Sequence, residues 1–232
     1  MSTIATTADT VAPAATARHR NRFALTGLLV GPLTAASTMI GAVLLDPAVK
    51  AAGPDAVAEA LADSRGLFQF GAIAGLAATL LLIVWAAGLH RFLETRVGRD
   101  HLAVRITQFA AAGAVGAMVI AFSLKAVFAG GLPGAIDATM YTSIDVAVLH
   151  ILHEQLQWVG LLSMVGAMFA VAWLALRERA LPRFLGIVSL VLALFVTGMT
   201  LGLALPYSAG LAVPVWIVVT SVWLLVRRER TA

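Results

Sequence analysis

The sequence predicts an all-α fold, a single polytopic membrane helix bundle of six transmembrane helices with both termini cytoplasmic. Hydrophobic residues make up 60% of the 232 residues and the mean hydropathy is +0.93, whereas a soluble domain is about half apolar. Six apolar runs are each long enough to cross a hydrocarbon core, which takes about 20 residues. Thirteen of the sixteen basic residues would lie on one side of the membrane, and by the positive-inside rule that side is cytoplasmic.

The chain divides into a tail and one membrane domain. Residues 1–20 are rich in Ala, Thr and Pro and are predicted to form a disordered cytoplasmic tail. Arg18, Arg20 and Arg22 introduce a long apolar run rather than a short cleavable one, which indicates a retained anchor. Residues 21–229 form the transmembrane domain, with spans predicted at 23–45, 67–91, 105–129, 155–176, 184–205 and 210–227.

Two substantial loops are expected on the side opposite the arginines. Within residues 46–66, the segment from Pro54 to Leu61 has the pattern of a short amphipathic helix opened by Pro and acidic residues. The second loop, residues 130–154, starts with a Gly-rich breaker cluster. From Ser143 to Arg177 a helix would cover roughly 50 Å. Either the fourth span projects from the bilayer, or a separate short helix precedes it.

Small residues recur four positions apart, a spacing that lets membrane helices approach closely. We expect these pairs to form seams of the bundle: Gly27 with Gly31, Gly71 with Gly75, Ala112 with Gly116, and Gly198 with Gly202.

The densest group of polar side chains is the stretch from His150 to Gln157. Positions 150, 153, 154 and 157 fall on one helical face, which brings together two imidazoles, a carboxylate and an amide. Glu154 lies 23 residues before Arg177, about 34 Å along a helix and so near the outer hydrocarbon boundary. We expect Lys125 and Gln69 at a similar depth.

Two interpretations of this group remain open. In the first, Lys125 pairs with Glu154 or Asp145 inside a polar pocket, because ionisable groups within spans tend to be partnered. In the second, all of these side chains are interfacial and Lys125 reaches water along its own stem.

The same residues define the chemistry that the sequence allows. Glu154 with His153 or His150 could exchange protons with a substrate. A metal at His150 and His153, helped by carboxylates such as Asp145 or Asp137, is a minor hypothesis, and no cofactor is predicted. The chain has no cysteine, which excludes disulfides and thiolate chemistry. Nucleic acid is not an expected partner, because the arginines flank apolar segments.

Three segments carry a resemblance to a known family. They are Asp55 to Leu61 leading through Ser64 to Gly71, His153 to Gly160, and Leu181-Pro182-Arg183-Phe184-Leu185-Gly186-Ile187. With these segments the chain resembles a broad bacterial family of uncharacterised six-helix integral membrane proteins, catalogued as a domain of unknown function. The resemblance supports six spans and implies no catalytic residues. An Ala- and Gly-rich composition that prefers Arg to Lys also suggests a bacterium with GC-rich DNA.

The sequence therefore predicts an integral protein of the bacterial cytoplasmic membrane that binds a lipid-like or small amphipathic ligand in an outer-leaflet polar pocket. Its partners would be membrane lipids and a hydrophobic small molecule. A membrane enzyme that uses the Glu/His pair is the first alternative, and a small permease is the second. The expected pocket walls are His150, His153, Glu154 and Gln157, with Lys125, Asp145 and Gln69 as neighbours.

Overall fold

The computed structural model describes residues 22–42, 45–130 and 141–227, and within these ranges it contains eight α-helices and no strand. The all-α prediction is confirmed, and the predicted tail at 1–20 lies outside the described residues. Two short helices precede the second span, and a 3-10 turn, Pro206–Ser208, joins the last two spans. The helices are α2 Phe23–Ala42, α3 Pro47–Ala52, α4 Pro54–Asp63, α5 Arg65–Val97, α6 Leu102–Phe128, α7 Ser143–Leu176, α8 Arg183–Leu203 and α9 Ala209–Val226.

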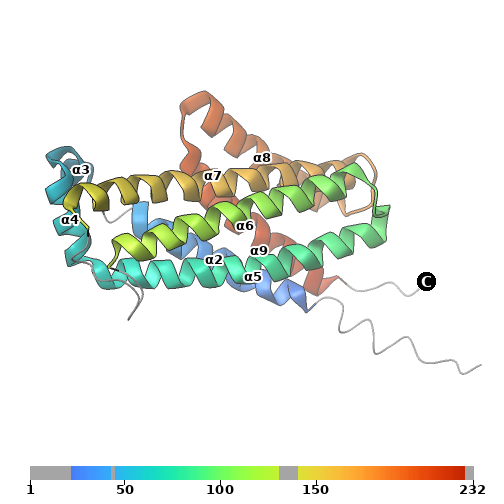
Figure 1. Cartoon of the computed structure of the whole chain (residues 1–232). Helices are drawn as coiled ribbons and strands as arrows, with labels where there is room; N and C mark the ends of the chain where they lie inside the picture. The colour runs from blue at the N-terminus through green and yellow to red at the C-terminus, as the bar shows by residue number, and fades with distance from the viewer. Residues whose placement is uncertain (1–21, 43–44, 131–140, 228–232) are drawn as a thin grey trace, which may run out of the picture.

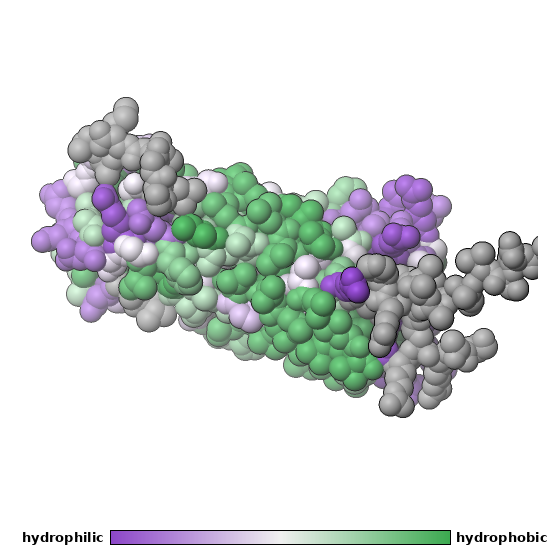
Figure 2. All heavy atoms as spheres, turned by 90° about the horizontal axis from the view of Figure 1, so that it is seen from below, coloured by the Kyte–Doolittle hydropathy of each residue, from purple (hydrophilic) through white to green (hydrophobic). Residues whose placement is uncertain are grey.

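Six of these helices are long and apolar enough to cross a membrane, as the sequence predicts. The hydrophobic surface forms a broad belt between two hydrophilic ends (Figure 2). Helix α2 begins and α9 ends at the same end of the bundle (Figure 1). We call this end the arginine-rich end, because nine of the ten described arginines belong to it: Arg22, Arg91, Arg96, Arg99, Arg105, Arg177, Arg179, Arg183 and Arg227.

The opposite end, which we call the cap end, is formed by α3, α4 and the adjoining turns of α5, α6 and α7 (Figure 1). The predicted amphipathic helix is confirmed as α4, which buries Val57 and Leu61. These two side chains belong to a small hydrophobic core separate from that of the bundle, and Phe68 and Phe128 complete it from α5 and α6. The cap end is therefore packed around apolar side chains of its own.

Helix α7 settles the question of the fourth span, because it is one continuous helix of 34 residues. A capping box starts it: the Asp145 backbone N–H donates to the Thr142 hydroxyl, and the Thr142 N–H donates to the Asp145 carboxylate at 2.9 Å. Its length is roughly 50 Å, against a hydrocarbon core of about 30 Å. The second alternative, a separate short helix, is wrong, and a helix of this length favours the first, a span that projects from the bilayer.

The small-residue seams are half confirmed. Gly27 and Gly31 of α2 pack against α5 and α9, and Gly75 of α5 packs against the ring of Phe122. Gly116, Gly198 and Gly202 face open space, so the prediction was wrong for those pairs. Spacing shows which residues share a face, but not whether another helix covers that face.

Helix α8 is the least enclosed of the six. It runs beside α7 from the arginine-rich end, and its far half then turns away from the bundle (Figure 1). Leu194, Leu201 and Leu203 are exposed there. In a bilayer these side chains would face lipid.

Candidate functional site

Four polar side chains are fully buried where α5, α6 and α7 meet near the cap end. Lys125 comes from α6, and His150, His153 and Gln157 come from successive turns of α7. None is more than 1% exposed. We call these four residues the polar cluster. The sequence predicts His150, His153, Glu154 and Gln157 as one group with Lys125 as a neighbour; three of the group and Lys125 are buried, and their role stays a prediction.

Lys125 is held by backbone and aromatic groups. Its Nζ donates to the Ser37 carbonyl oxygen of α2 at 2.6 Å and lies 5.7 Å from the centroid of the Phe68 ring. Gly71 makes the room for this ammonium group, because a Cβ there would lie 3.0 Å from Nζ. Three helices therefore enclose one lysine.

Both sequence-based expectations for Lys125 are corrected by this arrangement. The side chain does not reach water, since it is 0% exposed. It also forms no ion pair with Glu154 or Asp145: among the described residues no carboxylate oxygen lies within 4.0 Å of its Nζ. Close packing of α2 and α5 around Gly71 encloses the ammonium group, and each carboxylate has another partner.

The tautomer of His153 follows from its hydrogen bond. Its Nδ1 lies 2.8 Å from the Ala121 carbonyl oxygen, which can only accept. In the neutral ring Nδ1 therefore carries the proton and Nε2 keeps its lone pair. That Nε2 atom is buried and has no hydrogen-bond partner in the described part of the chain. His153 thus presents an acceptor to the cluster.

The other two members also carry unsatisfied atoms. Nδ1 of His150 and both amide atoms of Gln157 are buried without a hydrogen-bond partner within the described ranges. Nε2 of His150 lies 3.5 Å from Glu154 Oε1, too far for a good hydrogen bond. Buried polar groups are normally hydrogen-bonded, so several such atoms together indicate a place where a ligand could bind.

Glu154 does not join the buried cluster. Its carboxylate accepts from Lys50 Nζ of α3 at 2.8 and 2.9 Å, and its side chain is 17% exposed. The sequence did not predict Lys50 as the partner of Glu154. The only signal in the sequence is that Lys50 is the one lysine in the loop facing this end.

The other two residues predicted for the site, Asp145 and Gln69, lie at the edge of the polar cluster. Asp145 caps α7, and its carboxylate is engaged with Thr142, so it does not line the cluster. Gln69 lies on the seam between α5 and α6, where its Nε2 is 3.4 Å from the Ala129 carbonyl oxygen.

A pocket of about 170 Å³ opens at the cap end above the polar cluster. Arg65 of α5, Tyr141 and Phe128 line it together with apolar side chains of α4 and α7. We call it the cap pocket. The Phe128 ring also lies 5.4 Å from the His150 ring and 5.5 Å from the His153 ring. Phe128 therefore contacts both the pocket and the two histidines, and Phe68 packs beside it, 5.6 Å from Phe128 and 6.3 Å from His150 between ring centroids. Sequence reasoning did not find the cap pocket, although Arg65 is the one arginine described at this end.

No group of three or more His, Asp or Glu side chains suited to a metal occurs among the described residues. The carboxylates named for the metal hypothesis are engaged elsewhere or, in the case of Asp137, lie outside the described residues. The cluster instead offers one ammonium donor, one imidazole acceptor, and an amide that can do both. It can hold a polar group that both donates and accepts hydrogen bonds.

Comparison with known proteins places the chain in a family. The family model DUF4386, described as a domain of unknown function, matches residues 25–227. No curated protein and no solved structure matches the chain.

Proposed function

Since the chain belongs to the DUF4386 family, a domain of unknown function, we propose its role from the site itself. The protein is an integral membrane protein that binds a small amphipathic molecule at the cap end, through an acidic head group. The polar cluster and the cap pocket together form the binding site.

The enclosed amine of Lys125, 0% exposed and hydrogen-bonded to one backbone oxygen, carries this proposal. An ionised group inside a membrane protein is costly unless it is paired, and Lys125 makes one hydrogen bond to a backbone oxygen and none to a carboxylate of the described residues. An ammonium group has three donors. A carboxylate or phosphate from a ligand would supply both the missing charge and the missing acceptors.

The cap pocket supports an acidic ligand of small head-group size. Arg65 and Tyr141 line it, and both offer hydrogen-bond donors to an anion. A volume of about 170 Å³ is below the range of about 300–1,000 Å³ of drug-sized sites. The pocket therefore suits a head group, while an apolar tail would lie against the bundle in lipid. Phe128 lines the pocket and contacts both histidines, so a head group bound in the pocket would lie next to the cluster.

Acid–base catalysis, the first alternative, is less well supported at Glu154. Its carboxylate is paired with Lys50 and borders the cluster only at His150, 3.5 Å from Nε2. If the site has a base, His153 is the better choice, because its Nε2 lone pair is free within the described residues. The binding role requires only the charge and the hydrogen-bonding groups that the cluster presents.

We also propose that the arginine-rich end faces the cytoplasm of a bacterium. Nine of the ten described arginines lie there, as the positive-inside rule requires of the cytoplasmic side. A green fluorescent protein fused after the last residue should fluoresce in a bacterial host. An alkaline phosphatase fusion that is active at the same position would reverse the orientation.

Ligand binding can be tested with a matched pair of probes, dodecanoate and its uncharged methyl ester. Protein purified in a maltoside detergent is titrated with each probe, and binding is measured by native mass spectrometry. We expect dodecanoate to bind at least about tenfold more tightly than the ester, a difference of about 1.4 kcal/mol. Lys125→Met should abolish this preference.

Lys50→Gln is the control, because it removes a basic side chain at the same end that is already paired with Glu154. It should keep the preference for the acid. Equal binding of acid and ester by the unmodified protein, or an unchanged preference in Lys125→Met, would refute the proposed function.

A further inference from the structure

A second hollow lies in the membrane-facing surface, in the half of the bundle nearest the arginine-rich end. It has a volume of about 400 Å³ and lies between α5 and α6. Apart from His90 and Gln108, its walls are apolar. We call it the lateral groove. It shares no residue with the polar cluster or the cap pocket.

The groove follows from how α5 and α6 cross. Near the cap end Gly75 lets the two helices touch at the Phe122 ring, and towards the other end they diverge (Figure 1). The side chains between them there are small: Ala86 and Ala87 on α5, and Ala111 and Ala112 on α6. Methyl groups do not fill the widening space, so a channel open to lipid remains. Its volume is within the usual range of about 300–1,000 Å³ for ligand sites.

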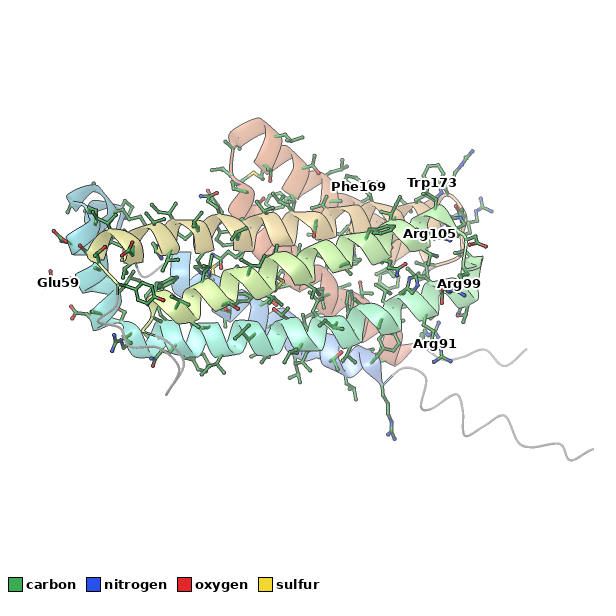
Figure 3. The ribbon with its side chains drawn as sticks, in the orientation of Figure 1. Glu59, Arg91, Arg99, Arg105, Phe169 and Trp173 are labelled. Carbon is green, nitrogen blue, oxygen red and sulfur yellow. The ribbon has the colours of Figure 1, made fainter. Side chains whose placement is uncertain are left out.

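The open end of the groove is positively charged. Arg91 on α5, Arg99 in the connection and Arg105 on α6 lie together at this end (Figure 3). Arg105 is 2.8 Å from Asp100, with both side chains largely exposed, and Arg99 is 3.8 Å from Glu94. Surface pairs of this kind are weak.

The whole arginine-rich end has nine described arginines against three described carboxylates. The excess charge is available to an anion.

Two polar side chains, Gln108 and His90, line the groove towards its arginine-rich end. Gln108 is exposed and lies three residues, about 4.5 Å along the helix, beyond Arg105. His90 is next to Arg91. Its Nε2 is 3.3 Å from Glu94, while its Nδ1 is buried without a hydrogen-bond partner in the described ranges. In this groove lipid ester oxygens could accept hydrogen bonds from the Gln108 amide, whereas the His90 ring, whose Nε2 faces the Glu94 carboxylate, has only its apolar edge to offer the lipid.

We infer that the lateral groove binds one anionic phospholipid of the leaflet at the arginine-rich end. One acyl chain lies between the alanines of α5 and α6. The ester region meets Gln108 and His90, and the phosphate lies among Arg91 and Arg105. Basic pockets between transmembrane helices are a recurrent way of holding anionic head groups.

The test uses phosphatidylglycerol and phosphatidylcholine with identical acyl chains. Each lipid is titrated into the detergent-purified protein, and bound lipids are counted by native mass spectrometry. We expect one phosphatidylglycerol to bind about fivefold or more tightly than phosphatidylcholine, since one arginine near the surface contributes about 1 kcal/mol. Arg105→Gln should reduce this preference about fivefold.

A pair of aromatic substitutions on α6 separates groove binding from general lipid contact. Ala112→Phe fills the groove and should remove the tightly bound phosphatidylglycerol. Ile120→Phe adds an aromatic ring at an exposed position outside the groove lining and should not change binding. Thermal unfolding of both variants confirms that they are folded.

Three results would overturn the inference. The first is equal affinity of the unmodified protein for the two lipids. The second is an equal effect of Ala112→Phe and Ile120→Phe. The third is a change in the mass of the protein assembly, rather than in bound lipid, on filling the groove, which would show that a protein helix occupies it.

Discussion

Replacing Lys125 by methionine should lower the free energy of unfolding by no more than about 1.5 kcal/mol. The substitution keeps a long, flexible side chain of similar volume and removes only the charge. For a residue buried as completely as Lys125, which is 0% exposed, this outcome would distinguish a lysine kept for binding from one kept for folding.

The expected change in the free energy of unfolding follows from the contacts that the Lys125 side chain makes. The hydrogen bond to the Ser37 carbonyl at 2.6 Å is of the charged type, worth about 1.5–3 kcal/mol. The contact with the Phe68 ring at 5.7 Å adds roughly 0.5–2 kcal/mol. Against these stands the cost of burying an ion, several kcal/mol even after relaxation of the protein. The terms nearly cancel, so we expect the free energy of unfolding to fall by no more than about 1.5 kcal/mol.

Lys125→Ala is the matched comparison, because it removes the charge and also leaves a cavity. A cavity of this kind should cost about 2–5 kcal/mol. Unfolding can be followed by the fluorescence of the five tryptophans as the mole fraction of a denaturing detergent is raised. Equal destabilisation by Lys125→Met and Lys125→Ala would mean that the ammonium group holds the helices together, and the reasoning would fail.

Two further predictions concern contacts outside the cluster. Gly75→Ala should lower the free energy of unfolding by about 1–3 kcal/mol, because the added Cβ would lie 2.5 Å from a ring carbon of Phe122. Gly198→Ala is the control: its Cβ would have no atom within 4 Å, so the substitution should be neutral or stabilising in the same detergent titration. A double-mutant cycle of Glu154→Gln with Lys50→Gln should give a coupling energy of about 0.2–1 kcal/mol. This coupling energy should be smaller at high salt. A coupling energy of zero would show that the 2.8 Å ion pair between the two side chains adds nothing to stability.

The sequence predicts the six spans well because their cause is local. Each run is apolar for about the length that a bilayer requires, and the arginines mark the ends. Length also predicts that α7 projects, since a helix from Ser143 onward is too long for the hydrocarbon core. Boundaries are less well predicted: the second span, expected at 67–91, is part of a helix from Arg65 to Val97, because polar turns outside the lipid continue the helix without an apolar signal.

The candidate site was predicted only in part, because pairing depends on tertiary contacts. The helical period places His150, His153 and Gln157 on one face, and all three are buried together. The helical period does not predict that Glu154, at the edge of that face, forms an ion pair with Lys50, which is 104 residues away in the sequence. The Lys125 side chain likewise points into the bundle only because Gly71, on helix α5, has no side chain.

The small core of the cap end implies that this protein is held together in two different solvents. The spans are packed in lipid, where apolar contact gives no advantage over the hydrocarbon chains. The cap end projects beyond that region, so the packing of Val57, Leu61 and Phe128 is driven by water and varies with temperature and urea. The cap can therefore loosen while the spans stay intact. Because Phe128 belongs to this core and contacts His150 and His153, dilute urea that loosens the cap would also disturb the polar cluster.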